Sequence, residues 1–225
     1  MHLKTIAYLR CDMPEKFGIP RQSGLVNSVK ARIIFTPKYR NPDALRGLEQ
    51  YSHLWLIWQF SEAIRDNWSP TVRPPRLGGN KRMGVFATRS PFRPNPIGLS
   101  SVKIEDIYLD TKDGPVIIVS GADIMDNTPI YDIKPYLAYV DSHPDASDGF
   151  ALNHHEAILK VVIPDEIRSL IPDEHVRPVI ELLGQDPRPQ YQNSPERSYT
   201  MTYANMDISF YVNEDELFVT DVRLL

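Results

Sequence analysis

Short strand-like segments with no long helices between them place the strongest limit on the fold of the first 145 residues. These segments are apolar or alternate between apolar and polar residues, and proline-rich connections separate them: 3–10, 31–35, 53–60, 84–88, 100–108 and 116–121. The apolar run 54–58 is typical of a strand buried on both faces. A doubly wound parallel sheet needs a helix between successive strands. The pattern therefore predicts an antiparallel sheet or barrel, with one short helix at 41–51 capped by Asp43.

The rest of the chain shows both strand-like and helix-like periodicity. It predicts a strand at 156–163, helices at 165–170 and 173–183, and three closing strands at 199–206, 207–212 and 216–222. A polar segment rich in turn residues, 141–149, has the composition of a linker. We therefore predict two domains, a β domain at 1–145 and a small α+β domain at 146–225, which together make a mainly β protein.

Charge is distributed unevenly along the chain. The net charge is -4, which taken alone argues mildly against a nucleic-acid partner. Residues 67–104, however, contain no Asp or Glu and seven Lys or Arg, which leaves -11 for the rest of the chain. Residues 1–145 carry +4 and residues 146–225 carry -8. The carboxylate-free stretch is therefore a local positive field that attracts phosphate despite the net charge.

Several common classes of function lack their signatures. The single cysteine, Cys11, excludes a disulfide framework and a cysteine-rich metal site, and it favours the reducing cytoplasm. No apolar run is long enough to span a membrane, no secretory segment is seen at the start, and no histidine pair has the spacing of a metal site. The glycine patterns of nucleotide-binding loops and the serine nucleophile elbow are absent as well. We predict a cytoplasmic protein without a metal ion.

Three proline-bearing segments carry the chemistry. Residues 70–98 hold six prolines, four glycines and six of the seven cations, so they predict a rigid loop that presents arginines to phosphate, carboxylate or bases. Residues 126–136 place Asp126, Asn127 and Thr128 where they can accept or donate hydrogen bonds at a strand end. In residues 185–191, Arg188 lies between two prolines. The alternatives are a solvated surface loop for the first and third segments and an Asx-type turn for the second.

Together with the early motif Pro20-Arg21-Gln22-Ser23-Gly24-Leu25, these segments resemble one family, the tRNA (adenine-37-N6)-methyltransferases called TrmO, also known as TsaA-like or YaeB-like proteins. The resemblance runs from Tyr8 to Tyr191 and includes motifs in the family's order and spacing: 46–49, 52–55, 73–79, 84–90 and 93–98. It implies a single-sheeted β-barrel methyltransferase that uses S-adenosylmethionine, works as a homodimer with the cofactor near the subunit interface, and methylates the exocyclic amine of threonylcarbamoyladenosine beside the anticodon of threonine tRNA.

The resemblance also assigns residues to the cofactor. They are Pro20, Arg21, Gln22, Phe60, Ser61, Arg89, Leu99, Asp126, Asn127, Thr128 and Pro129. Two of them depart from the family pattern, because Ser61 stands where His is common and Asn127 where Gly is common. Asparagine tolerates left-handed backbone angles, so we expect the turn at Asn127 to be kept.

The same resemblance suggests roles for the remaining candidates. Asp126 is the candidate acceptor for the amine proton, with binding of the cofactor or the base as its alternative role. An anticodon stem-loop offers a base that is already unpaired. Its phosphates would be contacted by Arg73, Arg76, Lys81, Arg82, Arg93, Lys134 and Arg188. The competing hypothesis is a non-catalytic RNA-binding module.

Overall fold

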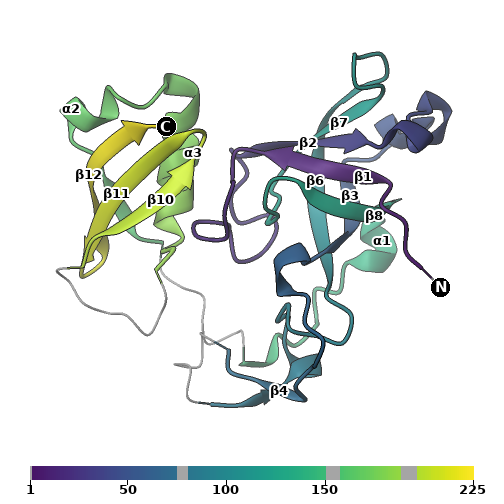
Figure 1. Ribbon diagram of the computed structural model, residues 1–225, viewed down its shortest axis with the longest axis horizontal. Coiled ribbons are helices and arrows are strands. Elements are labelled where there is room, and N and C mark those ends of the chain that lie inside the picture. Colours follow the sequence, from purple (N-terminus) through teal and green to yellow (C-terminus); the bar gives the residue numbers. More distant parts are fainter. Residues whose placement is uncertain (1, 75–80, 151–157, 189–196) are drawn as a thin grey trace.

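A closed six-stranded antiparallel barrel forms the first part of the chain (Figure 1). The computed structural model describes residues 2–74, 81–150, 158–188 and 197–225. The barrel strands follow each other around the barrel in the order β1-β2-β7-β6-β3-β8. Their bounds are β1 Ala7–Cys11, β2 Lys30–Phe35, β3 His53–Gln59, β6 Ile97–Tyr108, β7 Val116–Ser120 and β8 Thr128–Pro135. The antiparallel barrel predicted from the sequence is confirmed.

Alternating burial along the strands fills the barrel. In β3, Leu54, Leu56 and Trp58 point into the core, while Trp55 and Ile57 are only half-buried. The prediction that this strand is buried on both faces was therefore wrong, because the barrel wall has an outer face that nothing covers completely. The inward residues of the other strands complete the core, including Leu9, Ile33, Ile117 and Ile130.

Two local predictions in the first part were also wrong. Residues 84–88 do not form one strand, since only β5, Met83–Gly84, is extended and Val85–Ala87 form a 3₁₀ helix. The helix predicted at 41–51 is replaced by two 3₁₀ helices, Pro42–Leu45 and Leu48–Gln50, separated by Gly47 in a left-handed conformation. Asn41, and not Asp43, caps the first of them by accepting the Asp43 N–H. Further 3₁₀ helices are Pro37–Tyr39 and Ser61–Ala63.

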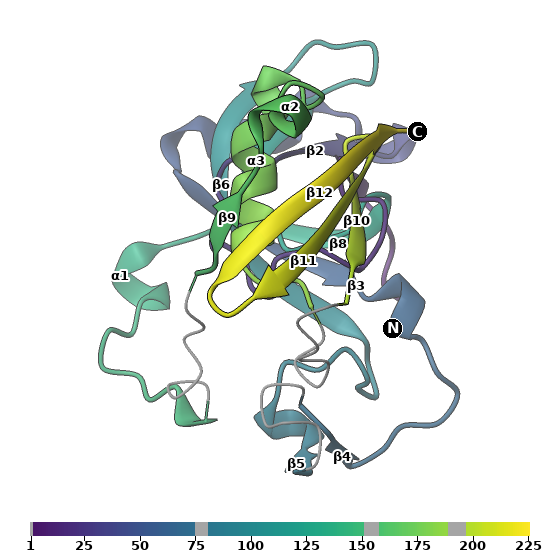
Figure 2. The ribbon, with the colours of Figure 1, turned by 90° about the vertical axis from the view of Figure 1, so that its left-hand side faces the viewer.

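The second part is a four-stranded sheet in the order β10-β11-β12-β9, with β9 parallel to β12. Its elements are β9 Lys160–Val162, α2 Asp165–Arg168, α3 Asp173–Gly184, β10 Tyr199–Tyr203, β11 Met206–Asn213 and β12 Glu216–Leu224. Figures 1 and 2 show α3 between this sheet and the barrel. The predicted α+β character of this part is confirmed. The boundary predicted near residue 146 follows α1, Ala138–Asp141, and stays a prediction.

A long loop of the first part belongs to the core of the second. Met13, Val26 and Val29 pack with residues of α3 and of the C-terminal sheet in one hydrophobic cluster. Ser28 adds two bonds to this contact, since its N–H and its hydroxyl both donate to the Glu181 carboxylate of α3, at 3.2 and 2.8 Å. The loop between β1 and β2, which carries Pro20, Arg21 and Gln22, is therefore attached to the second part of the chain near both of its ends.

A short ribbon projects from the barrel. It consists of β4, Thr71–Val72, paired with β5, and Figure 1 shows β4 beneath the barrel, apart from its wall. No helix in the described ranges is long and apolar enough to cross a membrane.

Candidate active site

The turn that leads into β8 is built around Asp126. The Cys11 N–H and the Arg10 Nε both donate to Asp126 Oδ1, at 2.9 and 3.0 Å, and the Asp126 N–H donates to the Met13 carbonyl. Both side-chain bonds end on Oδ1. Within the part of the chain that the structure describes, Oδ2 therefore keeps its lone pairs for a ligand or a proton, and the side chain is 26% exposed.

Asn127 adopts the conformation that its amide side chain tolerates. Its φ is 60°, in the left-handed region, and its N–H donates to the Leu9 carbonyl. The expectation that asparagine preserves this turn in place of glycine is confirmed. Thr128 is buried and donates to the Met125 carbonyl, while Pro129 lies opposite Tyr8 in the register of β8 with β1.

Gln22 and Arg89 meet although 66 residues separate them in the chain. Arg89 Nη1 donates to Gln22 Oε1 at 2.5 Å, and Gln22 Nε2 donates to the Arg21 carbonyl at 2.6 Å. The loop is set close to the barrel because the Gly24 N–H donates to the carbonyl of Gly121, at the end of β7. Two of the predicted cofactor segments are therefore in direct contact.

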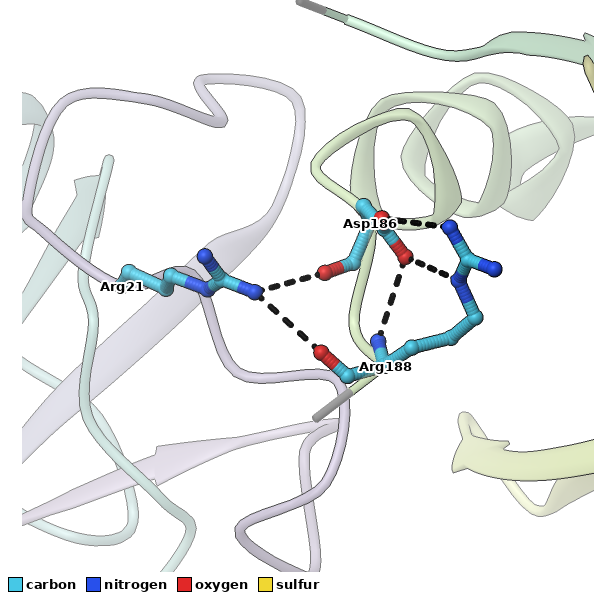
Figure 3. A network of polar contacts seen from close by, with 3 residues as sticks. All are labelled: Arg21, Asp186 and Arg188. Atoms are coloured by element: carbon cyan, nitrogen blue, oxygen red, sulfur yellow. Dashed lines mark hydrogen bonds and ion pairs between the residues drawn. The ribbon is translucent and has the colours of Figure 1, made fainter. Parts of the chain in front are cut away.

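Arg21 joins this loop to the second part of the chain. Its Nη2 donates to the carbonyls of Asp186 and Arg188, at 3.0 and 3.3 Å. Figure 3 shows Arg21 reaching across to this segment, where the Arg188 guanidinium holds the Asp186 carboxylate in a two-point ion pair at 2.7 and 2.9 Å. Arg188 is thus fixed in place by Asp186, and buried Pro20 precedes Arg21.

Phe60, Ser61 and Leu99 lie at one end of the β3 and β6 pair. The Phe60 N–H donates to the Pro96 carbonyl, and the Phe60 ring packs on Trp58 with centroids 4.2 Å apart. Ser61 is exposed and begins a 3₁₀ helix. Leu99 points outward from β6 and is 59% exposed, so it offers apolar surface to a ligand or to another chain.

Asp123, which had no signal in the sequence, is linked through Ser100 on β6 to Trp58 on β3. Its Oδ1 accepts the Ser100 hydroxyl at 2.5 Å, and Ser100 Oγ in turn accepts the Trp58 indole N–H at 2.9 Å. Burial raises the pKa of Asp123, against the opposing effects of Ser100, the Ser23 N–H and the positive charge of Arg89. This carboxyl group therefore lies near Ser100, Ser23 and Arg89. Arg89 is a predicted cofactor residue, and Ser23 and Ser100 directly follow the predicted cofactor residues Gln22 and Leu99 in the chain.

Replacement of Asp123 by Asn should raise thermal stability at neutral pH. In the parent, the raised pKa means that the partly buried carboxylate destabilises the fold once pH rises above that pKa, whereas the neutral amide still accepts the Ser100 hydroxyl. Lowering the pH through the raised pKa toward the ordinary value of 3.8 neutralises Asp123 and should close the gap. Melting curves of both proteins between neutral and acidic pH measure this. A gap that does not change with pH would contradict it.

A cleft of about 1640 Å³ opens beside Gln22 and Arg89. Among the described residues, it is lined by one carboxylate, Asp148, and by seven arginines: Arg21, Arg65, Arg73, Arg82, Arg89, Arg93 and Arg188. Four of the predicted RNA-contacting residues, Arg73, Arg82, Arg93 and Arg188, are thus brought to one cleft. Lys81 is exposed outside this lining, and Lys134 lies on β8, paired with Asp132 at 2.9 Å. Arg76 lies outside the described residues.

Two family models match the chain along most of its length. The tRNA-methyltransferase O N-terminal domain matches residues 8–142, and the TrmO C-terminal domain matches residues 157–225. The chain belongs to the TrmO family.

Relatives of the TrmO family match this chain from end to end. The tRNA (adenine(37)-N6)-methyltransferase of Escherichia coli is 40% identical over 98% of this chain and 97% of its own length. A putative S-adenosylmethionine-dependent methyltransferase of Pseudomonas aeruginosa is 40% identical over 98% of this chain and 96% of its own. The crystal structure of TrmO from Pseudomonas aeruginosa superimposes with a TM-score of 0.80 at 31% identity, covering 99% of this chain and 98% of that one.

The predicted cofactor residues of this TrmO-family chain offer contacts that an organic cofactor can use. No group of three or more His, Cys, Asp or Glu side chains able to hold a metal is found in the described ranges. Partial burial raises the pKa of the Cys11 thiol to about 12, so the thiolate form is disfavoured at neutral pH. The open Oδ2 of Asp126, the Gln22 and Arg89 pair and the outward Leu99 instead offer polar and apolar contacts suited to S-adenosylmethionine.

Proposed function

We propose that this chain is an S-adenosylmethionine-dependent methyltransferase that methylates the N6 amine of adenosine 37 in tRNA. The observation that carries the proposal is the contact of Gln22 with Arg89 at the edge of a cleft lined by seven arginines. It places residues assigned to the cofactor beside a surface suited to a polyanion. Membership of the TrmO family and the activity for which the Escherichia coli relative is named support the same conclusion.

The substrate we propose is threonylcarbamoyladenosine in threonine tRNA, presented by the anticodon stem-loop. Its threonyl group adds a free carboxylate next to the base, and guanidinium groups bind carboxylates through two parallel hydrogen bonds. The arginines of the cleft supply such groups. An anticodon-loop base is already unpaired, so its entry into the cleft costs less than flipping a base from a duplex.

The residues act mainly by positioning and by proton transfer. When bound, S-adenosylmethionine supplies a methyl group activated by its sulfonium sulfur. The loop around Gln22, Arg89 and the turn at Asn127 would fix the geometry for an in-line displacement, and such positioning can supply up to roughly 7–11 kcal/mol of the barrier reduction. The open Oδ2 of Asp126 would accept the proton that the amine loses, while the Arg10 guanidinium on Oδ1 keeps the carboxylate anchored.

We also propose a cytoplasmic homodimer in which the outer wall of the barrel forms the subunit interface. Ile97 and Leu99 are exposed and apolar on the outer face of β6, and Leu99 is also a predicted cofactor residue. Exposed apolar residues that gather on one face are typical of contact surfaces between chains. Sedimentation of the purified protein at micromolar concentration tests the dimer, and a monomer under those conditions would contradict it.

The activity is tested by methyl transfer from labelled S-adenosylmethionine to threonylcarbamoylated threonine tRNA. We expect incorporation into the modified tRNA, and comparison with the unmodified transcript tests the substrate assignment. Calorimetric titration with S-adenosylmethionine separates the enzyme from a non-catalytic RNA-binding module, which would not bind the cofactor. Absence of both incorporation and cofactor binding would overturn the proposal.

Arg73→Ala should weaken tRNA binding and lower the slope of log affinity against log salt by about 1, because one phosphate contact is lost. Affinity for S-adenosylmethionine should be unchanged. Arg223→Ala is the matched control, because Arg223 lies on β12, outside the cleft lining, and pairs with Asp221. Filter binding over a salt series measures both variants, and an unchanged slope for Arg73→Ala would make that arginine structural.

A further inference from the structure

An exposed pair of stacked aromatic rings forms part of the cleft. Trp68 and Phe86 are 52% and 71% exposed, and both line the cleft. Their ring centroids lie 6.0 Å apart with an interplanar angle of 29°. Neither residue belongs to the two hydrophobic clusters of the protein. Two large rings exposed at an arginine-lined cleft instead of packed in a core require another explanation, since burial would stabilise the fold more.

The backbone around Phe86 is held by several bonds. The Val85 N–H donates to the Pro70 carbonyl, which connects the Phe86 turn to the segment that follows Trp68. Arg93 Nη1 donates to the carbonyls of Thr88 and Val85, at 2.6 and 3.3 Å. The turn therefore presents Phe86 in a fixed position, so little ordering is needed when a ligand binds.

Arginines surround these rings. The Arg93 guanidinium lies 5.8 Å from the centroid of Phe86, and the Arg65 guanidinium lies 3.8 Å from that of Phe92, a third ring in the cleft lining. Exposed aromatic faces interleaved with guanidinium groups are the combination that binds unpaired nucleotides, because bases stack on the rings while the cations attract the phosphates.

We propose that Trp68 and Phe86 form a stacking platform for unpaired bases of the RNA substrate, next to the base that is methylated. This inference rests on the proposed function for the identity of the RNA. A second copy of this chain fits the surface less well. In a symmetric dimer this patch would face itself, and the arginines that line it would be opposed to each other with few carboxylates to balance them.

The test compares Trp68→Ala and Phe86→Ala with the parent in binding to a free anticodon stem-loop and to a fully paired, blunt-ended RNA duplex, without cofactor. Loss of one stacked base should weaken stem-loop binding about 5- to 150-fold, whereas duplex binding should change less than twofold. Tyr139→Ala is the matched control, because Tyr139 is 84% exposed on α1 and is not part of the cleft lining.

Trp68→Phe supplies a second readout that a folding defect cannot imitate. It keeps an aromatic face, so stem-loop affinity should stay within about threefold of the parent, and the quenching of tryptophan fluorescence that stacking causes should be lost. Unchanged stem-loop affinity in both alanine variants would overturn the platform, even if methyl transfer is observed. A change of sedimentation in these variants, with RNA affinity unchanged, would assign the surface to self-association. Weaker stem-loop binding without any methyl transfer would support the platform and contradict the proposed activity.

Discussion

Asp126→Asn is expected to lower the rate of methyl transfer about 100- to 10,000-fold, the range that a positioned proton acceptor contributes. The amide oxygen can still accept the Cys11 N–H, so the turn and the affinity for S-adenosylmethionine should stay close to those of the parent. The amide nitrogen, however, has no basic lone pair for the amine proton. Single-turnover kinetics with saturating cofactor and modified tRNA measure the chemical step directly.

Asp126→Ala separates anchoring from proton transfer. It removes the acceptor of the Cys11 N–H and the partner of Arg10, which costs about 1–3 kcal/mol for an unsatisfied, partly buried donor. We therefore expect this variant to lose stability and cofactor affinity as well as rate. If Asp126→Asn methylates tRNA at the parental rate, the carboxylate has only the anchoring role, and another group takes the proton.

Gly98→Ala is expected to destabilise the fold by about 3 kcal/mol, at the upper end of the range for overpacked cores. Gly98 is buried in β6, and a Cβ there would lie 2.2 Å from Cε2 of the Trp58 ring. The ring cannot simply move away, because it is itself buried and its indole N–H donates to Ser100. A shift of Trp58 would also disturb the bond between Ser100 and Asp123. Thermal and denaturant unfolding measure the loss.

Gly84→Ala is the matched control for this substitution. A Cβ at Gly84 meets no atom within 4 Å, and Gly84 has a φ of -57°, which alanine adopts without strain. Its stability should stay within about 0.5 kcal/mol of the parent. Equal melting temperatures for the two alanine variants would show that the barrel adapts around Trp58 and would contradict the packing argument.

The sequence predicted most strands because alternation and apolar runs reflect burial directly. It did not reveal β8, because Asp126 and Asn127 just before the strand and the two prolines within it are typical of a turn. Pro129 is accommodated because β8 pairs there with β1 alone, whereas pairing with β3 runs from Ile130 to Pro135. At 84–88, the apolar residues have the sequence pattern of a strand, but they lie at the cleft and only Val85 among them is buried. Tertiary context decided both cases.

The candidate site was only partly predictable for a related reason. Motif order identified Gln22 and Arg89 separately, and the fold brings them into contact. Asp123 had no local signal, because its burial and its bond to Ser100 come from residues distant in the chain. Trp68 lies in no motif, Phe86 lies in the motif 84–90 without an assigned role, and only their exposure distinguishes the two residues. Residues whose role depends on long-range contacts or on what leaves them uncovered are not visible in a single sequence.

The bonds from Arg21 to the carbonyls of Asp186 and Arg188 carry a thermodynamic consequence. They make the loop that holds Gln22 and the end of α3 one mechanical unit, although the segments belong to different parts of the chain. If cofactor binding stabilises the joined arrangement, it strengthens RNA binding to that arrangement. RNA binding then strengthens cofactor binding by the same factor. Cofactor and RNA should therefore bind with positive cooperativity, each lowering the dissociation constant of the other.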